Sequence, residues 1–159
     1  LDEVARTARR WRQEHDIQIL FVDYLQRIRV PRSESRIEEV AEVSRGLKTL
    51  ARDLGIPVVA LAQVKAEVDK RTGDKRPGLG DIANSDEATR EADQIGFLYR
   101  DEVYDDESPD RGIAELNVEK NRHGPTGQFQ LRFFAETMTF ADLATGHGFD
   151  GRAAAAGGA

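Results

Sequence analysis

Two polar residues, Asp23 and Gln63, each follow a run of largely apolar residues in the first half of the sequence. Residues 17–22 contain five bulky apolar side chains before Asp23, and residues 56–62 form the run before Gln63. Ligands bind at the carboxyl ends of strands in parallel sheets. A carboxylate there can hold the magnesium ion of a nucleotide, and an amide can sense the terminal phosphate or its water. The pair therefore predicts nucleotide hydrolysis, and hydrogen bonding to loop backbone is the alternative.

A second candidate is the pair of cations Lys120 and Arg122, in the segment Lys-Asn-Arg-His-Gly. Side chains two residues apart on a strand point to the same side, so these two can converge on one anion. A guanidinium suits a transferring phosphoryl group because it donates several hydrogen bonds in a planar fork. The alternative is a pair of solvated charges at the edge of a sheet.

Two basic loops follow the same strand ends. Residues 27–36 carry four arginines against one glutamate, and residues 65–76 hold five lysine and arginine residues. These nine positive charges gather in a chain of net charge -6, which is what binding to a phosphate backbone requires. A solvated surface is the alternative. Neither loop carries aromatic residues for base stacking, so sequence reading is not expected. The candidate contacts to nucleic acid are Arg29, Arg32, Lys65, Lys70, Arg71, Lys75 and Arg76.

The elements that position these residues follow from hydrophobic periodicity and local signals. Ser35, with Glu38 three residues later, predicts the start of a long amphipathic helix, and Gly55 predicts its end. A strand, a helix and a strand joined by short connections form a right-handed crossover in a parallel sheet. We expect the two strands, at 17–22 and 56–62, to be fully buried.

The rest of the chain predicts further elements around this crossover. An amphipathic helix precedes the first strand, and a long polar loop follows the second. The expected elements are helices over 1–11 and 86–92, a strand over 94–99, a hairpin of strands 113–119 and 129–134, and a short strand at 139–143. The tail 146–159 is rich in Gly and Ala and is expected to be disordered.

Composition limits the possible functions. The 159 residues, 17.7 kDa, suit one domain with a hydrophobic core. The sequence contains no cysteine, which excludes disulfides, thiolate–zinc sites and a cysteine nucleophile. No apolar run approaches the roughly 20 residues of a membrane span, and no leader precedes the first helix, so we expect a cytoplasmic protein without a membrane partner. The start at Leu1 suggests a fragment or a processed product.

Taken together, these segments resemble the DnaB-like replicative helicases, within the RecA-type motor proteins. The similar segments are ILFVDYLQRI, which resembles the Walker B motif, SRIEEVAEVSRGLKTLARDLGIPVVALAQV, which ends in the sensor glutamine, and FLYRDEVY with VEKNRHGPTG. The resemblance runs from about residue 1 to 143. It implies an α/β, P-loop NTPase-type fold: a mostly parallel sheet flanked by helices, with an antiparallel hairpin at one edge. Residues 1–145 would be the C-terminal part of the motor domain.

The resemblance also implies roles for individual residues. Asp23 would orient Mg2+ and its waters, and Gln63 would sense the γ-phosphate of ATP. Lys120 and Arg122 would reach into the nucleotide site of the neighbouring subunit, with Arg122 as an arginine finger. Such a contact in trans implies a ring, which is a homo-hexamer in this family. The implied function is 5′ to 3′ translocation on single-stranded DNA during replication, with primase and a helicase loader as further candidate partners.

The sequence departs from the family pattern in two places. No G-K-[ST] occurs in it, and the family's phosphate-binding loop and catalytic glutamate lie upstream of the similar region, so we expect this chain alone to be inactive. The family's Arg-Glu-Ser-Gly is replaced by residues 83–86, in which Asn84 is the remaining candidate DNA contact. This suggests a divergent member from a phage or mobile element. The alternatives are another RecA-like ATPase, such as a recombinase or ring ATPase, and a non-catalytic half-core that modulates a helicase ring.

Overall fold

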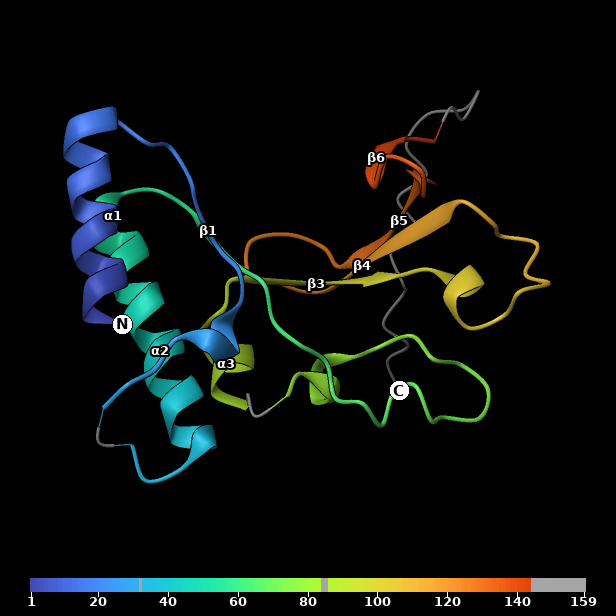
Figure 1. Ribbon diagram of the computed structural model, residues 1–159, viewed down its shortest axis with the longest axis horizontal. Coiled ribbons are helices and arrows are strands. Elements are labelled where there is room, and N and C mark those ends of the chain that lie inside the picture. The colour runs from blue at the N-terminus through green and yellow to red at the C-terminus, as the bar shows by residue number, and fades with distance from the viewer. Residues whose placement is uncertain (32, 84–85, 144–159) are drawn as a thin grey trace, which may run out of the picture. The chain divides into compact units, whose positions relative to one another are not determined.

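The computed structural model describes residues 1–31, 33–83 and 86–143 (Figure 1). The chain forms two compact units. The first unit comprises Leu1–Lys65 and Gly80–Ala92, and the second comprises Ala66–Leu79 and Asp93–Ala159. Three features of the sequence lie outside the described residues, namely Arg32, Asn84 and the tail 146–159.

The first unit contains the predicted helix, strand, helix, strand order. Its elements are α1 (Asp2–His15), β1 (Leu20–Val22), the 3-10 turn η1 (Leu25–Arg27), α2 (Arg36–Leu54), β2 (Val58–Ala60), η2 (Leu79–Asp81) at its border, and α3 (Asp86–Glu91). β1 and β2 pair in parallel, with Leu20 opposite Val58 and Val22 opposite Ala60. The expected parallel pair joined by a helix is therefore confirmed.

Local signals set both ends of α2. The Ser35 side chain accepts a hydrogen bond from the backbone N–H of Glu38 at 3.2 Å, as an N-cap does. The Glu38 carboxylate accepts from the backbone N–H of Glu34 at 3.1 Å, one residue before the partner that a capping box would use. Gly55 ends the helix with a φ of 64°, a left-handed conformation that glycine adopts at little cost.

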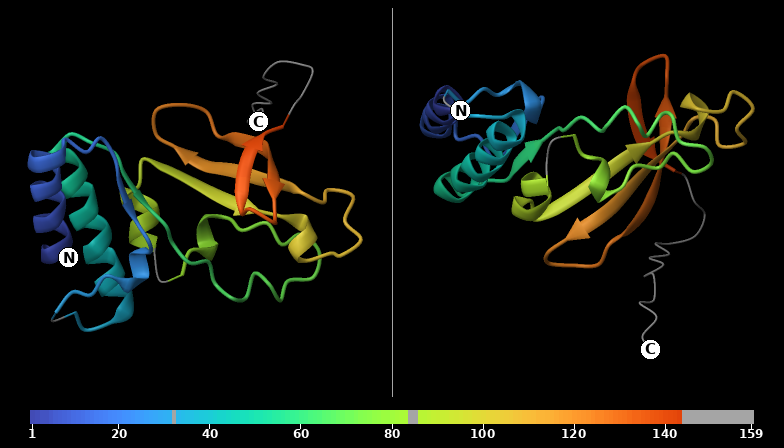
Figure 2. Two further views of the ribbon diagram at one scale, coloured as in Figure 1. Left: turned by 45° about the horizontal axis from the view of Figure 1, so that its top comes forward. Right: turned by 90° about the horizontal axis from the view of Figure 1, so that it is seen from below.

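β1 is buried on one face and no residue of β2 is fully buried, so the expectation of full burial was wrong. Leu20 and Val22 belong to a core cluster with residues of α1 and α2, and these two helices lie side by side (Figure 2). Side chains alternate between the two faces of a strand. The opposite face is therefore exposed among the described residues, with Phe21 67% and Val59 38% exposed.

The second unit is built on one antiparallel sheet with strand order β3-β4-β5-β6. Its elements are β3 (Gln94–Tyr99), the 3-10 turn η3 (Asp101–Val103), β4 (Ile113–Asn121), β5 (Gly127–Phe134) and β6 (Thr139–Asp142). The expected hairpin is confirmed as β4 and β5. β3 pairs with β4, and β6 pairs with β5. The α/β class is confirmed, and the antiparallel part of the described structure is larger than the single hairpin that the sequence predicted.

The long polar loop of residues 66–79 packs within the second unit. Val68 is only 1% exposed, although it lies in a mostly polar segment. The Tyr104 hydroxyl donates to Asp69 at 3.0 Å. The loop is thus held by burial and side-chain bonds.

In the described parts of the chain, no helix is long and apolar enough to cross a membrane.

Candidate nucleotide and nucleic-acid sites

Asp23 and Gln63 lie at the carboxyl ends of the adjacent parallel strands β1 and β2, as predicted. The backbone pairing continues past the strands, because Leu61 N–H donates to the Val22 carbonyl at 2.9 Å and Leu25 N–H donates to the Leu61 carbonyl at 2.8 Å. Both side chains are exposed, and no group among the described residues forms a hydrogen bond or ion pair with either. We call Asp23 and Gln63 the strand-end pair. The carboxylate of Asp23 and the amide of Gln63 are therefore open to solvent.

The donor set of this edge fits a magnesium ion that arrives with a nucleotide. A carboxylate oxygen is the hard ligand that Mg2+ prefers, and Mg2+ is commonly bound by one or two carboxylates together with substrate phosphates and water. Asp23 offers such a carboxylate to solvent. Within residues 1–31, 33–83 and 86–143, no three acidic or histidine side chains form a cluster that could hold a metal by themselves.

Gln26 is a residue of this edge that the sequence reasoning missed. The residue is 8% exposed. Its Nε2 donates to the carbonyl of Gln63 at 3.5 Å and to that of Ala83 at 3.3 Å, and its Oε1 accepts from Gln63 N–H at 3.2 Å. These partners are 37 and 57 residues away in the sequence, so no local pattern could have revealed them.

Lys120 and Arg122 lie at the end of β4, in the second unit. The strand ends at Asn121 and Arg122 belongs to the following turn, so strand alternation sets the direction of the Lys120 side chain but not that of Arg122. Arg122 Nη1 donates to Asp93 Oδ1 at 3.1 Å, and both side chains are nearly half exposed. Asn121 Nδ2 donates to the carbonyl of Pro125 at 3.0 Å and holds the turn. The arginine is thus presented at a fixed, accessible place.

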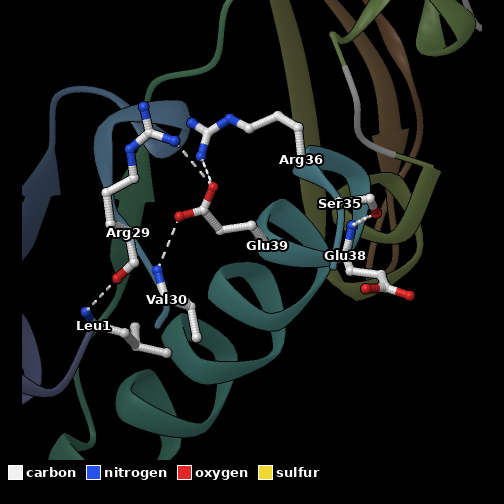
Figure 3. A network of polar contacts seen from close by, with 7 residues as sticks. All are labelled: Leu1, Arg29, Val30, Ser35, Arg36, Glu38 and Glu39. Atoms are coloured by element: carbon white, nitrogen blue, oxygen red, sulfur yellow. Dashed lines mark hydrogen bonds and ion pairs between the residues drawn. The ribbon is translucent and has the colours of Figure 1, made fainter. Parts of the chain in front are cut away.

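The first basic loop is anchored by the carboxylate of Glu39, a buried residue. Figure 3 shows its polar contacts. Glu39 accepts from Val30 N–H at 2.9 Å and from Arg29 Nη1 at 3.2 Å, and it also pairs with Arg36. The Val30 N–H is the main reason that the pKa of Glu39 lies below its ordinary value, and the two arginines act in the same direction. The Arg29 side chain remains 75% exposed, so its position is fixed while its guanidinium stays open to solvent.

The second basic loop contributes to a cluster of rings and charges in the second unit. Arg76 donates two hydrogen bonds to the buried Glu115, from Nε at 2.6 Å and from Nη2 at 2.7 Å. Its guanidinium lies 4.6 Å from the ring centroid of Tyr99, which stacks on Tyr104 at 5.6 Å. Lys75 lies 5.0 Å from the Tyr104 ring. We call Arg76, Glu115, Tyr99 and Tyr104 the tyrosine–arginine cluster.

The cluster shifts the proton affinities of its members. The hydrogen bonds to Glu115 raise the pKa of Arg76, which stays charged at any pH of interest. Burial is the main cause that raises the pKa of Tyr99, followed by its hydrogen bond to Asp101. The basic loop itself carries no aromatic residue. The folded unit supplies them from β3 and from the residue after η3.

The other candidate DNA contacts have different surroundings. Lys65 Nζ donates to the Gly80 carbonyl at 2.7 Å within the first unit. Lys70 and Arg71 lie in an exposed turn. Arg32 and Asn84 lie outside the described residues. The structure therefore brings Asp23 and Gln63 to one edge, and it gives the described basic residues different local surroundings.

Comparison with known proteins places this chain in a family. Residues 1–142 match the family model described as the DnaB-like helicase C terminal domain. The chain is 44% identical over 144 residues to the replicative DNA helicase DnaB of Haemophilus influenzae, covering 90% of this chain and 31% of that protein. It is 40% identical over 145 residues to DnaB of Geobacillus stearothermophilus, covering 90% and 32%. The chain thus spans about a third of the length of these curated relatives.

Solved structures agree with the sequence relatives. One solved ATPase domain aligns with a TM-score of 0.80 and 38% identity, covering 87% of this chain and 49% of that chain. A solved structure of a DnaB-like replicative helicase and its interactions with primase aligns with the same TM-score and identity, over 87% of this chain and 34% of its own. The predicted family and fold are confirmed. This chain belongs to the family of DnaB-like helicase C-terminal domains.

Proposed function

We propose that this chain is part of an ATP-dependent DNA helicase that unwinds duplex DNA at replication by moving 5′ to 3′ along single-stranded DNA. One observation carries the proposal: the exposed side chains of Asp23 and Gln63 stand at the carboxyl ends of adjacent parallel strands. Ligands bind at this edge of a parallel sheet, so in a member of the DnaB-like family these exposed polar side chains are candidates for contacting a nucleotide.

The proposed cofactors are ATP and Mg2+, and the strand-end pair supplies this chain's part of their site. Asp23 would orient the metal and its waters through its carboxylate. Gln63 would meet the terminal phosphate or the attacking water through its amide. When bound, the metal would neutralise charge on the phosphates. The phosphate-binding loop would come from a segment outside this sequence, because no G-K-[ST] occurs in it.

Lys120 and Arg122 would complete the nucleotide site of a neighbouring subunit. The turn after β4 fixes Arg122 beside Asp93 and leaves it nearly half exposed. A guanidinium inserted in trans stabilises the charge on the transferring phosphoryl group and is worth about 10³- to 10⁵-fold in rate in related mechanisms. The proposed assembly is therefore a homo-hexameric ring, as the family resemblance implies.

Single-stranded DNA is the proposed polymer partner, bound through its phosphates. The exposed turn at Lys70 and Arg71 supports this contact most directly, and the exposed guanidinium of Arg29 supports it from the first unit. The full proposed set is Arg29, Arg32, Lys65, Lys70, Arg71, Lys75, Arg76 and Asn84.

Primase and a loader are proposed as protein partners, primase because one of the similar structures is that of a helicase and its interactions with primase. The proposed location is the cytoplasm.

The test uses the full-length protein that contains this segment, with Arg122→Ala. We expect ATP turnover to fall by about 10³-fold or more, because the variant removes the charge that stabilises the transition state in the neighbouring site. The mass of the assembly should stay that of the wild type. Arg111→Ala, which removes an exposed arginine of the same unit, is the matched control. Wild-type turnover in the Arg122 variant would contradict the proposal.

A further inference from the structure

Gln26 lies three residues after Asp23 and joins the two strand ends of the candidate site. It belongs to η1, which begins two residues after Asp23, and its side chain reaches the backbone that follows β2. It bonds both backbone polar groups of Gln63: Oε1 accepts from the N–H at 3.2 Å, and Nε2 donates to the carbonyl at 3.5 Å. The residue proposed to meet the γ-phosphate is therefore held from both sides of its own Cα.

The orientation of the Gln26 amide follows from its partners. Two carbonyl oxygens, of Gln63 and Ala83, accept from Nε2, and one N–H donates to Oε1. The reversed amide would place its oxygen against two carbonyl oxygens and its NH2 against an N–H, so three partners select one arrangement. Gln26 as a whole is 8% exposed. Water therefore has little access to replace these bonds if the amide is removed.

The same amide also fixes a third backbone segment. Ala83 N–H donates to the Gln63 carbonyl at 2.9 Å, Lys65 N–H donates to the Asp81 carbonyl at 2.7 Å, and Val64 forms a bridge with Ile82. The carbonyl of Gln63 thus accepts both from Ala83 and from Gln26. Any shift of this segment therefore changes the bonds that hold the backbone of Gln63.

We propose that Gln26 is a positioning residue: it fixes the backbone of Gln63, and through it the direction of the sensor amide, relative to the end of β1 that carries Asp23. This inference rests on the proposed function, because it assigns Gln26 a role in the reaction that the strand-end pair serves. Gln26 itself does not touch the nucleotide, because it acts through Gln63.

A double-mutant cycle in the full-length protein tests the inference. The variants are Gln26→Leu, which keeps the approximate size and removes all three hydrogen bonds, Gln63→Ala, and the double variant. Gln13→Leu, on the exposed face of α1, is the matched control. We expect Gln26→Leu to lower kcat by about 10- to 100-fold, the scale seen when a reacting group is misplaced. KM for ATP should change little, since no contact to substrate is removed.

The coupling to Gln63 separates positioning from a merely structural role. If Gln26 acts through Gln63, adding Gln26→Leu to Gln63→Ala should lower kcat no further, because the side chain that was positioned is already gone. Effects that multiply, or an unchanged kcat in Gln26→Leu, would overturn the inference. If Gln26→Leu does not fold, Gln26→Asn gives the same cycle, because it keeps an amide in place and shortens its reach by one methylene.

The same measurements separate this inference from the proposed function. A wild-type protein that hydrolyses ATP, together with variants that fail the cycle, would remove only the role of Gln26. A wild-type protein without ATP hydrolysis would remove the proposed function, and the role of Gln26 with it. The Gln13→Leu control should match the wild type in kcat and KM.

Discussion

The strand-end pair of the first unit and the tyrosine–arginine cluster of the second unit differ in what their polar side chains contact. Asp23 and Gln63 present a carboxylate and an amide to solvent, with no bonds to their side chains among the described residues. Arg76 instead donates two short bonds to the buried carboxylate of Glu115 and stacks on Tyr99. One region keeps its polar atoms available, and the other uses them to hold the fold.

Charged residues that look alike in the sequence have different surroundings in the structure. Arg76, Lys70 and Arg71 all belong to one basic loop, and composition gives each the same weight as a DNA contact. The structure separates them, because the guanidinium of Arg76 bonds a buried acid while Lys70 and Arg71 lie in an exposed turn. The exposed turn and the strand-end pair are therefore stronger candidates for functional contacts than the tyrosine–arginine cluster.

The largest structural effect is expected from Arg76→Met. It leaves Glu115 buried without its partner, which costs about 3–5 kcal/mol for a fully buried pair. Arg76 is itself 37% exposed, so solvent screening reduces our estimate to about 2 kcal/mol. Amide hydrogen exchange of β3 and β4 in the full-length protein should quicken by about 30-fold. Arg111→Met is the control. An unchanged exchange rate would show that the cluster does not stabilise this sheet.

A smaller effect, dependent on pH, is expected from Glu39→Gln. The pKa of Glu39 in the folded protein lies below its ordinary value of 4.5, so the folded state binds fewer protons than the unfolded state and this charge stabilises the fold above that value. The stability difference between wild type and variant should be present at neutral pH and disappear as the pH falls through the lowered folded value. Thermal unfolding measured between about pH 3 and pH 7 checks this.

The control for Glu39 is Glu42→Gln, an exposed residue of the same helix. Its stability curve should follow the wild type across the same pH range. A Glu39 variant that also follows the wild type would mean that the carboxylate does not anchor the first basic loop. A stability difference that grows as the pH falls would contradict a lowered pKa of Glu39 in the folded protein.

The smallest effect is expected from the double charge reversal Lys70→Glu and Arg71→Glu. If both residues neutralise phosphates, the slope of log affinity for single-stranded DNA against log salt should flatten by about 1.4, or about 0.7 for each contact. Equilibrium titrations at several salt concentrations measure it. Arg6→Glu with Arg10→Glu, on α1, makes the same change of net charge as a control. An unchanged slope would show that the turn is only a solvated surface. Exposure would then not distinguish DNA contacts from the other basic residues of the loop.

The features that the sequence predicted well depend on local chemistry. Ser35 and Gly55 mark the ends of α2 because an N-cap hydroxyl and a left-handed glycine act within one helical turn. Asp23 and Gln63 could be placed at one sheet edge because two apolar runs joined by a helix pair in parallel. These inferences needed no knowledge of distant residues.

The features that the sequence could not predict depend on partners far along the chain. Phe21 looked buried because it lies in an apolar run, but its exposure depends on which face the helices cover. The partners of Gln26 are 37 and 57 residues away, and Glu115 is 39 residues from Arg76. Sequence composition also could not show that Tyr99 and Tyr104 meet the basic loop. The roles of Arg32 and Asn84 stay predictions.

The most direct test of the proposed nucleotide site is ATP turnover by the full-length protein with Asp23→Asn, measured beside its thermal unfolding. Asparagine keeps the shape and removes the charge that would orient the metal. We predict a loss of turnover of at least about 100-fold with an unchanged unfolding midpoint, since the substitution breaks no hydrogen bond or ion pair among the described residues. Asp106→Asn, an exposed acid of the second unit, should change neither. Turnover near that of the wild type would contradict the assignment of this strand end to the nucleotide site.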